Sequence, residues 1–235
     1  MTILSHLLDL RKRLFYVILV FINLFLVSYF FANELFHLLV APLVRALPMK
    51  SSLIATQITA PVLMPLSLAA DAALLATAPF ALLQLWRFIA PGLYRDERFH
   101  LSSALIASLL LFCLGVLFCF YLVLPFLFQF FTKNITEGVR LMPDMTYVLD
   151  FITRMLLIFG LSFQLPLLCL TLVQLRWIDL AVLKKIRPYV IVAAFVVGML
   201  LTPPDVLSQL MLALPLCILY ELGIILVKIR PIRLS

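Results

Sequence analysis

Long apolar runs alternate with short polar segments along the whole chain. Several of these runs approach the length of about 20 residues that an α-helix needs to cross the hydrocarbon core of a bilayer. The pattern therefore predicts an all-α integral membrane protein, organised as a single transmembrane domain over residues 1–235. Six transmembrane helices are expected, of which the fifth and sixth are short: about 14–31, 71–89, 103–127, 147–175, 188–202 and 206–227.

Prolines mark the segment between the first two predicted helices. Residues 32–70 are apolar but contain Pro42, Pro48, Pro61 and Pro65. Inside a helix, proline removes a backbone donor and clashes with the preceding turn. We therefore expect an ordered outer-face cap of short helices and turns here, and not a further transmembrane helix.

The distribution of basic residues predicts the orientation in the membrane. Of the 18 Lys and Arg residues, 13 lie at the segment ends that share a side with the N terminus, and 4 lie at the opposite ends. Loops rich in Lys and Arg stay on the cytoplasmic side, so both termini are expected in the cytoplasm. The first apolar run, Leu14 to Asn33, lacks a small-residue cleavage pattern and is expected to be an anchor.

Composition supports a membrane protein and excludes several other classes. With 65% hydrophobic and 12% charged residues and a mean hydropathy of +1.19, the chain has too little polar surface for a soluble domain. The net charge of +7 is typical of loops beside a membrane and does not indicate a nucleic-acid partner. The four cysteines form no CxxC and no metal-ligand spacing with the three histidines, so no metal or cofactor is predicted.

Two aspartates each precede an arginine by four residues. Asp9 precedes Arg13, and Asp150 precedes Arg154. Residues four apart are neighbours on a helix surface, so an ion pair within the helix is expected in both cases.

Two further acids have local interpretations. Asp71 stands at the start of the second predicted helix, where it would complement the positive end of the helix dipole. Glu221 lies near the inner end of the last predicted helix and is expected to reach towards Lys228 or the lipid headgroups.

The loop after the second predicted helix combines aromatic residues, a chain turn and charge. It lies in the stretch from Gln84 to Arg98, Q-L-W-R-F-I-A-P-G-L-Y-R-D-E-R, in which Pro91-Gly92 turns the chain. From the residues alone, Glu97 is better explained as a partner of a neighbouring arginine, or as an acid at the next helix start, than as a ligand site.

No catalytic motif is present. The sequence has no G-x-S-x-G, no H-E-x-x-H and no phosphate-binding glycine loop, so the chain is predicted not to be an enzyme. An intramembrane hydrolase is disfavoured because no credible nucleophile–base pair is found. The alternative of a small-molecule or ion secondary transporter is disfavoured because there is no internal repeat and no charged midplane site.

Six motifs occur in a fixed order along the chain. They are H-L-L-D-L-R-K-R-L (6–14), A-P-L-V (41–44), the stretch at 84–98, F-G-L-S-F-Q-L-P (159–166), K-K-I-R-P-Y (184–189) and G-M-L-L-T-P-P-D-V-L-S-Q (198–209). In these motifs the chain resembles the TatC family, the multi-span subunit of the Sec-independent twin-arginine protein translocase.

The resemblance implies a receptor for twin-arginine signal peptides in the bacterial cytoplasmic (inner) membrane. It also implies assembly with single-span partner subunits of the TatA/TatB type, an oligomer of receptor complexes, and export of folded proteins driven by the proton-motive force. The family's signal-peptide site uses two acids, which fall on Asp9 and Glu97. A carboxylate accepts a guanidinium through two hydrogen bonds, a geometry that lysine cannot reproduce. The candidate site also includes Arg13, Phe88, Leu93 and Arg95.

The chain departs from the family pattern at two positions. Asp9 stands where the family usually has Glu, and Gln164 stands where an intramembrane Glu is common. Gln164 keeps hydrogen bonding without a charge, and we expect it to be a polar anchor on a concave face, bound to water or to a partner helix. Met199, Thr202 and Gln209 fall in the family's docking region for the single-span subunits; for Thr202 and Gln209, local capping after the Pro-Pro turn is an equal alternative.

Overall fold

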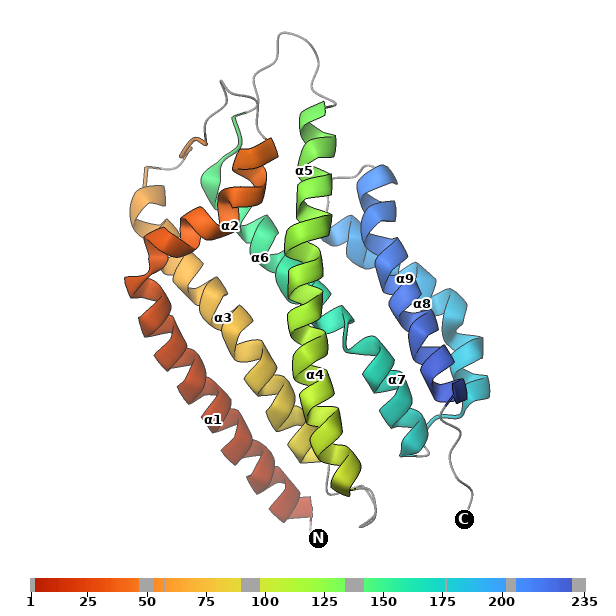
Figure 1. Cartoon of the computed structure of the whole chain (residues 1–235). Helices are drawn as coiled ribbons and strands as arrows, with labels where there is room; N and C mark the ends of the chain where they lie inside the picture. Colours follow the sequence, from red (N-terminus) through yellow and green to blue (C-terminus); the bar gives the residue numbers. More distant parts are fainter. Residues whose placement is uncertain are drawn as a thin grey trace. The chain divides into compact units, whose positions relative to one another are not determined.

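The computed structural model of the chain is helical in nearly all of the residues that it describes, which are 3–46, 53–56, 58–89, 98–133, 142–175, 177–201 and 206–229. Figure 1 shows the order of the elements along the chain. They are α1 (Ile3–Phe30), α2 (Ala32–Ala46), α3 (Ala60–Ile89), α4 (Arg98–Phe118), the π-helix η3 (Cys119–Val123), α5 (Leu124–Lys133), α6 (Met145–Ser162), α7 (Leu165–Gln174), α8 (Leu180–Leu201) and α9 (Val206–Ile229).

Five helical segments in the described part of the chain are long and apolar enough to cross a membrane. They are Leu8–Phe30, Ala60–Phe88, Ala104–Lys133, Met145–Gln174 and Gln209–Ile229. The prediction of an all-α membrane protein is thus confirmed. The fifth predicted helix, 188–202, corresponds to part of α8. This helix is not among the five segments because its first half contains Lys184, Lys185 and Arg187.

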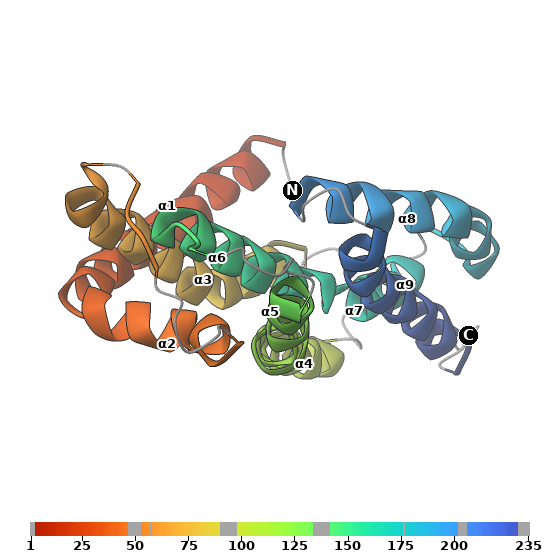
Figure 2. The ribbon, with the colours of Figure 1, turned by 90° about the horizontal axis from the view of Figure 1, so that it is seen from above.

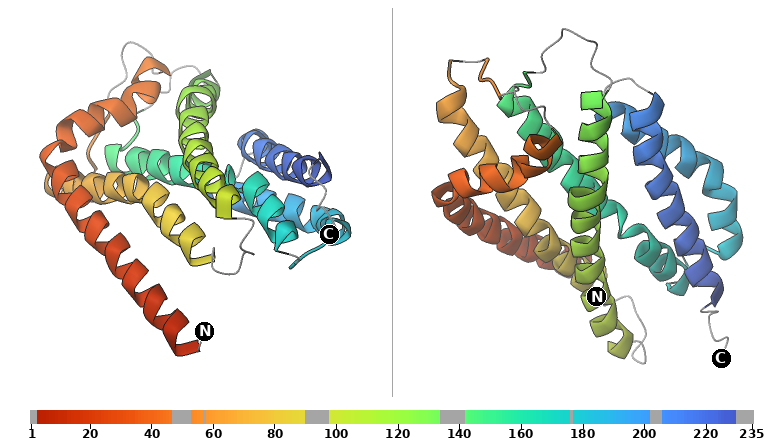
Figure 3. Two further views of the ribbon diagram at one scale, coloured as in Figure 1. Left: turned by 60° about the horizontal axis from the view of Figure 1, so that its bottom comes forward. Right: turned by 45° about the horizontal axis from the view of Figure 1, so that its top comes forward.

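The chain divides into two compact units. One contains Met1–Ile89 and Leu117–Leu157, and the other contains Ala90–Val116 and Ile158–Ser235. In the first unit α1 lies beside α3, and α2 turns away from α1 to contact α3 and α5 (Figure 3). The core of this unit is formed by fully buried apolar side chains, among them Val40, Leu68, Leu124, Leu127, Ile152, Met155 and Leu156.

In the second unit α9 packs against both α7 and α8 (Figure 2). Their shared core contains Cys169, Val173, Leu183, Tyr220, Ile224 and Val227. The buried hydroxyl of Tyr220 donates to the backbone oxygen of Leu183 at 2.7 Å, which joins α9 to α8 and satisfies the one polar group of this core cluster.

Two helices begin earlier than the prolines predict. The second was expected from residue 71, but α3 starts at Ala60 and accommodates Pro65 and Pro79. Pro61 falls in the first turn, where backbone N–H groups have no partner in the helix and their loss costs nothing. Likewise α8 begins at Leu180 and includes Pro188, which was expected to be its first residue.

One predicted helix is interrupted, and another contains a π-helix. The segment 147–175 was expected to be continuous, but α6 ends at Ser162 and α7 starts at Leu165, with Pro166 in its first turn. In the third apolar segment the N–H of Leu124 bonds to the oxygen of Cys119, five residues earlier. Pro125 follows directly, and a proline that cannot donate to its preceding turn is a common cause of such a local change.

In its described residues, the predicted cap region 32–70 contains α2, a short extended piece and the first part of α3. Ile54 forms a parallel bridge with Asp144, in which its N–H donates to Pro143 at 3.1 Å and its oxygen accepts from Met145 at 3.0 Å. Pro48 lies outside the described residues. The segment is therefore ordered where it is described, with more helix than the proline content predicts.

Candidate functional site

Asp9 and Arg13 form the predicted ion pair on α1. The Arg13 Nε donates to Asp9 Oδ2 at 2.9 Å, and the Asp9 side chain is 42% exposed. Arg13 also reaches α3, where its guanidinium donates to the amide oxygen of Gln84 at 3.4 Å. Among the side chains that the structure describes, which on α1 begin at Leu8, no other donor bonds to Asp9, so its second oxygen can accept a further donor.

The end of α3 carries two aromatic residues close in sequence to Gln84, the contact of Arg13 on this helix. Trp86 is buried and Phe88 is partly buried, both within the last turn of α3. Sequence reasoning missed Gln84, although it is the first residue of the motif at 84–98 and a polar side chain in an apolar run. The other predicted members of the site, Leu93, Arg95 and Glu97, lie outside the described residues.

Gln164 lies at the break between α6 and α7, and it is buried. Its Nε2 donates to the backbone oxygen of Ser108 at 2.9 Å, and its Oε1 accepts from the Ser108 hydroxyl at 2.8 Å. Gln164 was expected to bind water or a helix of a partner protein. In the structure it bonds to Ser108 on α4 of the same unit. Ser108 was missed because it is one of three serines in a run of 34 residues without Asp, Glu, Lys or Arg, 99–132, and carries no local signal.

Two glycines allow the helices around Gln164 to approach closely. A Cβ added at Gly115 would lie 2.7 Å from the backbone oxygen of Phe159, and one at Gly160 would lie 2.7 Å from the ring of Phe112. Heavy atoms cannot approach so closely without a shift of the surrounding structure, so these positions hold α4 against the segment that carries Gln164.

Asp144 is a second carboxylate with a rich set of donors. It accepts from the N–H and hydroxyl of Thr56, and it caps α6 by accepting from the N–H groups of Thr146 at 2.8 Å and Tyr147 at 3.3 Å. The hydroxyl of Thr56, followed by these backbone donors, lowers the pKa of Asp144 to about 2. An aspartate directly before a helix start is a sequence signal for this cap.

Two acids, Asp150 and Asp71, form contacts within or between the apolar helices. The Asp150–Arg154 pair is confirmed, with 2.8 Å between the charged atoms. Asp71 does not stand at a helix start: it lies in the interior of α3 and accepts from the Thr153 hydroxyl at 3.1 Å. The expectation for Asp150 needed only a spacing of four residues and is confirmed, whereas the expectation for Asp71 needed a helix that begins at residue 71 and is wrong.

Glu221 was expected to reach Lys228 or the headgroups, but it pairs with Arg187 of α8 at 2.8 Å. The correction has a physical reason, since α8 packs along α9 and offers a closer cation than the next turns of α9 do. Met199, a predicted docking residue, is 64% exposed at the end of α8. Gln209 is partly buried on α9 and its backbone lies next to Gly198, whereas Thr202 lies outside the described residues.

Comparisons with known proteins agree on one family. The family model described as Sec-independent protein translocase protein (TatC) matches residues 5–215. The chain is 42% identical over 225 residues to the Sec-independent protein translocase protein TatC of Escherichia coli K12, covering 94% of this chain and 86% of that protein. It is 39% identical over 229 residues to the TatC protein of Haemophilus influenzae, with 96% and 88% covered.

The fold agrees as well. A crystal structure of the twin-arginine translocase receptor TatC superposes with a TM-score of 0.87 at 32% sequence identity, over 95% of this chain and 98% of that one. Both comparisons extend across nearly the whole chain, so they apply to α1 and the end of α3 as well as to the C-terminal helices.

Proposed function

Because the chain belongs to the TatC family of Sec-independent protein translocase proteins in the bacterial inner membrane, we propose that Asp9 and Glu97 form its binding site for twin-arginine signal peptides. The crystal structure that it resembles is that of a twin-arginine translocase receptor. The proposed site lies on the cytoplasmic side, with both termini, and includes Arg13, Phe88, Leu93 and Arg95.

One observation supports this proposal most directly: Arg13 holds the Asp9 carboxylate in place through only one of its two oxygens. Arg13 binds one oxygen at 2.9 Å and is itself tied to Gln84 of α3. No other side chain that the structure describes donates to this carboxylate. A guanidinium of the signal peptide can therefore add to Asp9 without first breaking an existing hydrogen bond.

The energy of this contact depends on how far the peptide covers it. An exposed ion pair contributes about 0–1 kcal/mol. A charge-assisted hydrogen bond that is partly shielded from water contributes about 1.5–3 kcal/mol. Phe88 at the end of α3, and the exposed Leu8 on α1, supply apolar surface against which the peptide can pack.

We further propose that the last two helices dock the single-span partner subunits. Met199, Thr202 and Gln209 belong to this surface, and the exposed side chain of Met199 and the partly buried Gln209 are compatible with it. Polar contacts between helices in lipid typically contribute about 0.6–2 kcal/mol each. Gln164 contributes differently, as an internal anchor of α4 and α7.

The proposed topology has six spans in one transmembrane domain, with α8 as the fifth. The charge-free part of α8 runs from 188 to 201, which is only about 21 Å of helix. Its basic first half would lie at the cytoplasmic surface, where Arg187 is neutralised by Glu221. The α2 region would form the outer-face cap, and the receptor would act without a catalytic reaction of its own.

Site-specific photocrosslinking tests the receptor site. A photoreactive phenylalanine analogue at position 88 is exposed to a signal peptide with Arg-Arg, and to the same peptide with Lys-Lys. The matched control places the analogue at Phe126, an exposed aromatic of α5 in the same unit. We expect a crosslink from position 88 that is selective for Arg-Arg, and none from position 126.

Equal labelling by both peptides at position 88 would contradict the proposed site, because a nonspecific apolar contact does not distinguish Arg from Lys. Labelling from position 126 at the same level would mean that the peptide binds the membrane surface of the protein generally. Either result would move the recognition role away from α1 and the end of α3.

A further inference from the structure

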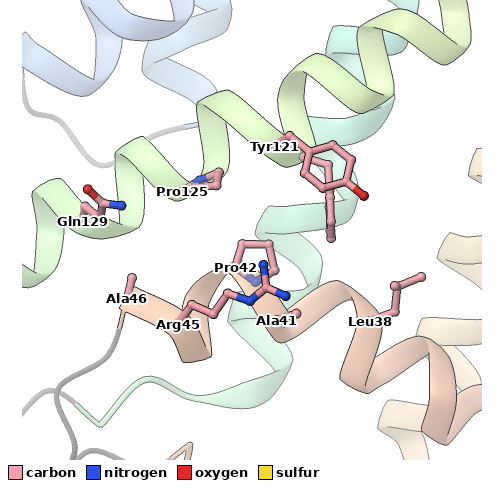
Figure 4. A pocket seen from close by; sticks show the side chains of 9 residues that line it. Leu38, Ala41, Pro42, Arg45, Ala46, Tyr121, Pro125 and Gln129 are labelled. Atoms are coloured by element: carbon pink, nitrogen blue, oxygen red, sulfur yellow. The ribbon is translucent and has the colours of Figure 1, made fainter.

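A groove of about 380 Å³ runs between α2 and the continuous helical path of η3 and α5, within one compact unit. Figure 4 shows its two walls facing each other. Short side chains explain why it is open: Ala41, Pro42 and Ala46 on α2, and Pro125 on α5, do not fill the space between the helices. A groove of this kind can be occupied by a ligand of matching shape.

The π-helix shapes the second wall. Tyr121, in the middle of η3, lines the groove and is 70% exposed. Its ring stands edge-on to that of Phe120, with the ring centroids 5.2 Å apart. Two consecutive aromatic residues thus line one groove, and π-helices of this length occur frequently at functional sites.

Polarity changes along the groove. Gln129 lies towards one end and Leu38 and Tyr121 lie towards the other, while the side chain of Arg45 extends from α2 towards the middle of the groove (Figure 4). Gln129 is four residues from Lys133, where the third candidate span ends, so it lies about 6 Å from that end along the helix. Tyr121 lies about 18 Å from it. The Gln129 end of the groove is therefore nearer the end of this candidate span than the Tyr121 end is.

The charge of the groove selects among amphipathic ligands. Among the described residues that line the groove, Arg45 is the one that carries a charge, and it is exposed. It has no ion-pair partner in the part of the chain that the structure describes. A guanidinium binds a phosphate through charge-assisted hydrogen bonds, and none of the described lining residues is a carboxylate that could hold a positively charged headgroup.

We propose that this groove binds an anionic glycerophospholipid from the leaflet opposite the N-terminal end of α1. Arg45 binds the phosphate, and the amide of Gln129 bonds to the headgroup or the glycerol ester. One acyl chain lies along Leu38 and Phe120, over the short side chains of α2. A zwitterionic phospholipid fits the same apolar end but leaves its ammonium group without a partner.

Native mass spectrometry of the purified full-length chain tests this, with dioleoyl phosphatidylglycerol and dioleoyl phosphatidylethanolamine added separately. We expect one phosphatidylglycerol per chain to be retained at about a tenfold lower lipid concentration than phosphatidylethanolamine. Arg45→Gln should abolish the difference. Lys133→Gln, which removes an exposed cation in the last turn of α5 that does not line the groove, should preserve it.

A second variant separates the groove from general charge attraction. Ala46→Phe keeps Arg45 but fills the space beside it, and should weaken retention of both lipids. Circular dichroism melting establishes that each variant is folded. Equal retention of the two lipids by the wild-type chain, or a preference that survives in Arg45→Gln, would overturn the proposal. So would a second copy of the chain, retained independently of lipid and lost in Ala46→Phe, because it would assign the groove to a protein.

Discussion

Asp9 and Asp144 are two carboxylates of the same compact unit that differ in how many donors the chain supplies to them. An ionised carboxylate has about four acceptor sites. Asp144 receives four hydrogen bonds, two from Thr56 and two from the start of α6. Among the side chains that the structure describes, Asp9 receives one, from Arg13. Asp144 is thus fully used in holding the chain together, whereas Asp9 keeps an oxygen for the proposed signal-peptide ligand.

The largest effect is expected from Asp9→Asn, which removes the charge but hardly changes the shape. Affinity for a twin-arginine peptide should fall about tenfold or more, which corresponds to roughly 1.4 kcal/mol or more, because one charge-assisted bond is lost. Isothermal titration calorimetry measures it. Asp144→Asn is the control and should leave the affinity unchanged; equal losses in the two variants would remove the distinction between these carboxylates.

Gln164→Leu extends the comparison to a neutral group whose donor and acceptor are both used. The substitution removes both buried hydrogen bonds between Gln164 and Ser108, so stability should fall by about 1–3 kcal/mol. Thermal unfolding in detergent measures the loss. Peptide affinity should not change in the protein that remains folded. A stable variant with weakened peptide binding would mean that Gln164 acts on the ligand and is not an internal anchor.

Arg13→Gln tests whether the free oxygen of Asp9 needs to be oriented. Without the bond from Arg13, the carboxylate turns freely and distinguishes a planar guanidinium less well from an ammonium. We expect the ratio of Arg-Arg to Lys-Lys affinity to fall about two- to fivefold, which corresponds to about 0.4–1 kcal/mol. Arg154→Gln breaks the equivalent pair on α6 and should leave the ratio unchanged. An unaltered ratio in Arg13→Gln would show that the pair has no part in selectivity.

The smallest effect concerns the pH dependence of the Asp144 contacts. Because its pKa is lowered from 3.8 to about 2, these contacts stabilise the folded chain fully at a pH above about 4. Their contribution is lost as the pH falls through about 2. The amide resonance of Thr56, which donates to Asp144 at 2.8 Å, should report this titration. A midpoint near 3.8 would mean that the Thr56 contacts do not stabilise the ionised carboxylate.

Local contacts could be predicted from the sequence, whereas distant ones could not. The Asp9–Arg13 and Asp150–Arg154 pairs follow from a spacing of four residues on a helix, and both are confirmed. Glu221 was assigned a nearby partner, but its partner is 34 residues away on α8. No rule of spacing indicates which helix will pack against it.

Helix boundaries show a related difference. Hydrophobic length predicted where apolar helices occur, but proline was given too much weight as a helix breaker. Pro65 and Pro188 lie inside helices, while the actual break at 163–164 falls in a motif that reads as continuous. In an apolar helix, packing against neighbours compensates for a lost backbone bond, and that packing is a property of the fold and not of the local sequence.

The close approach at Gly115 has a consequence for how this gene can vary. Every missense change of that codon introduces a Cβ 2.7 Å from the backbone oxygen of Phe159, a group that cannot rotate away as a side chain can. At Gly198 the nearest atom would be 3.5 Å away, an ordinary contact. Among surviving alleles the codon for Gly115 should therefore show almost no amino-acid replacement, while the codon for Gly198 should admit alanine. Both encode a buried glycine within a helix.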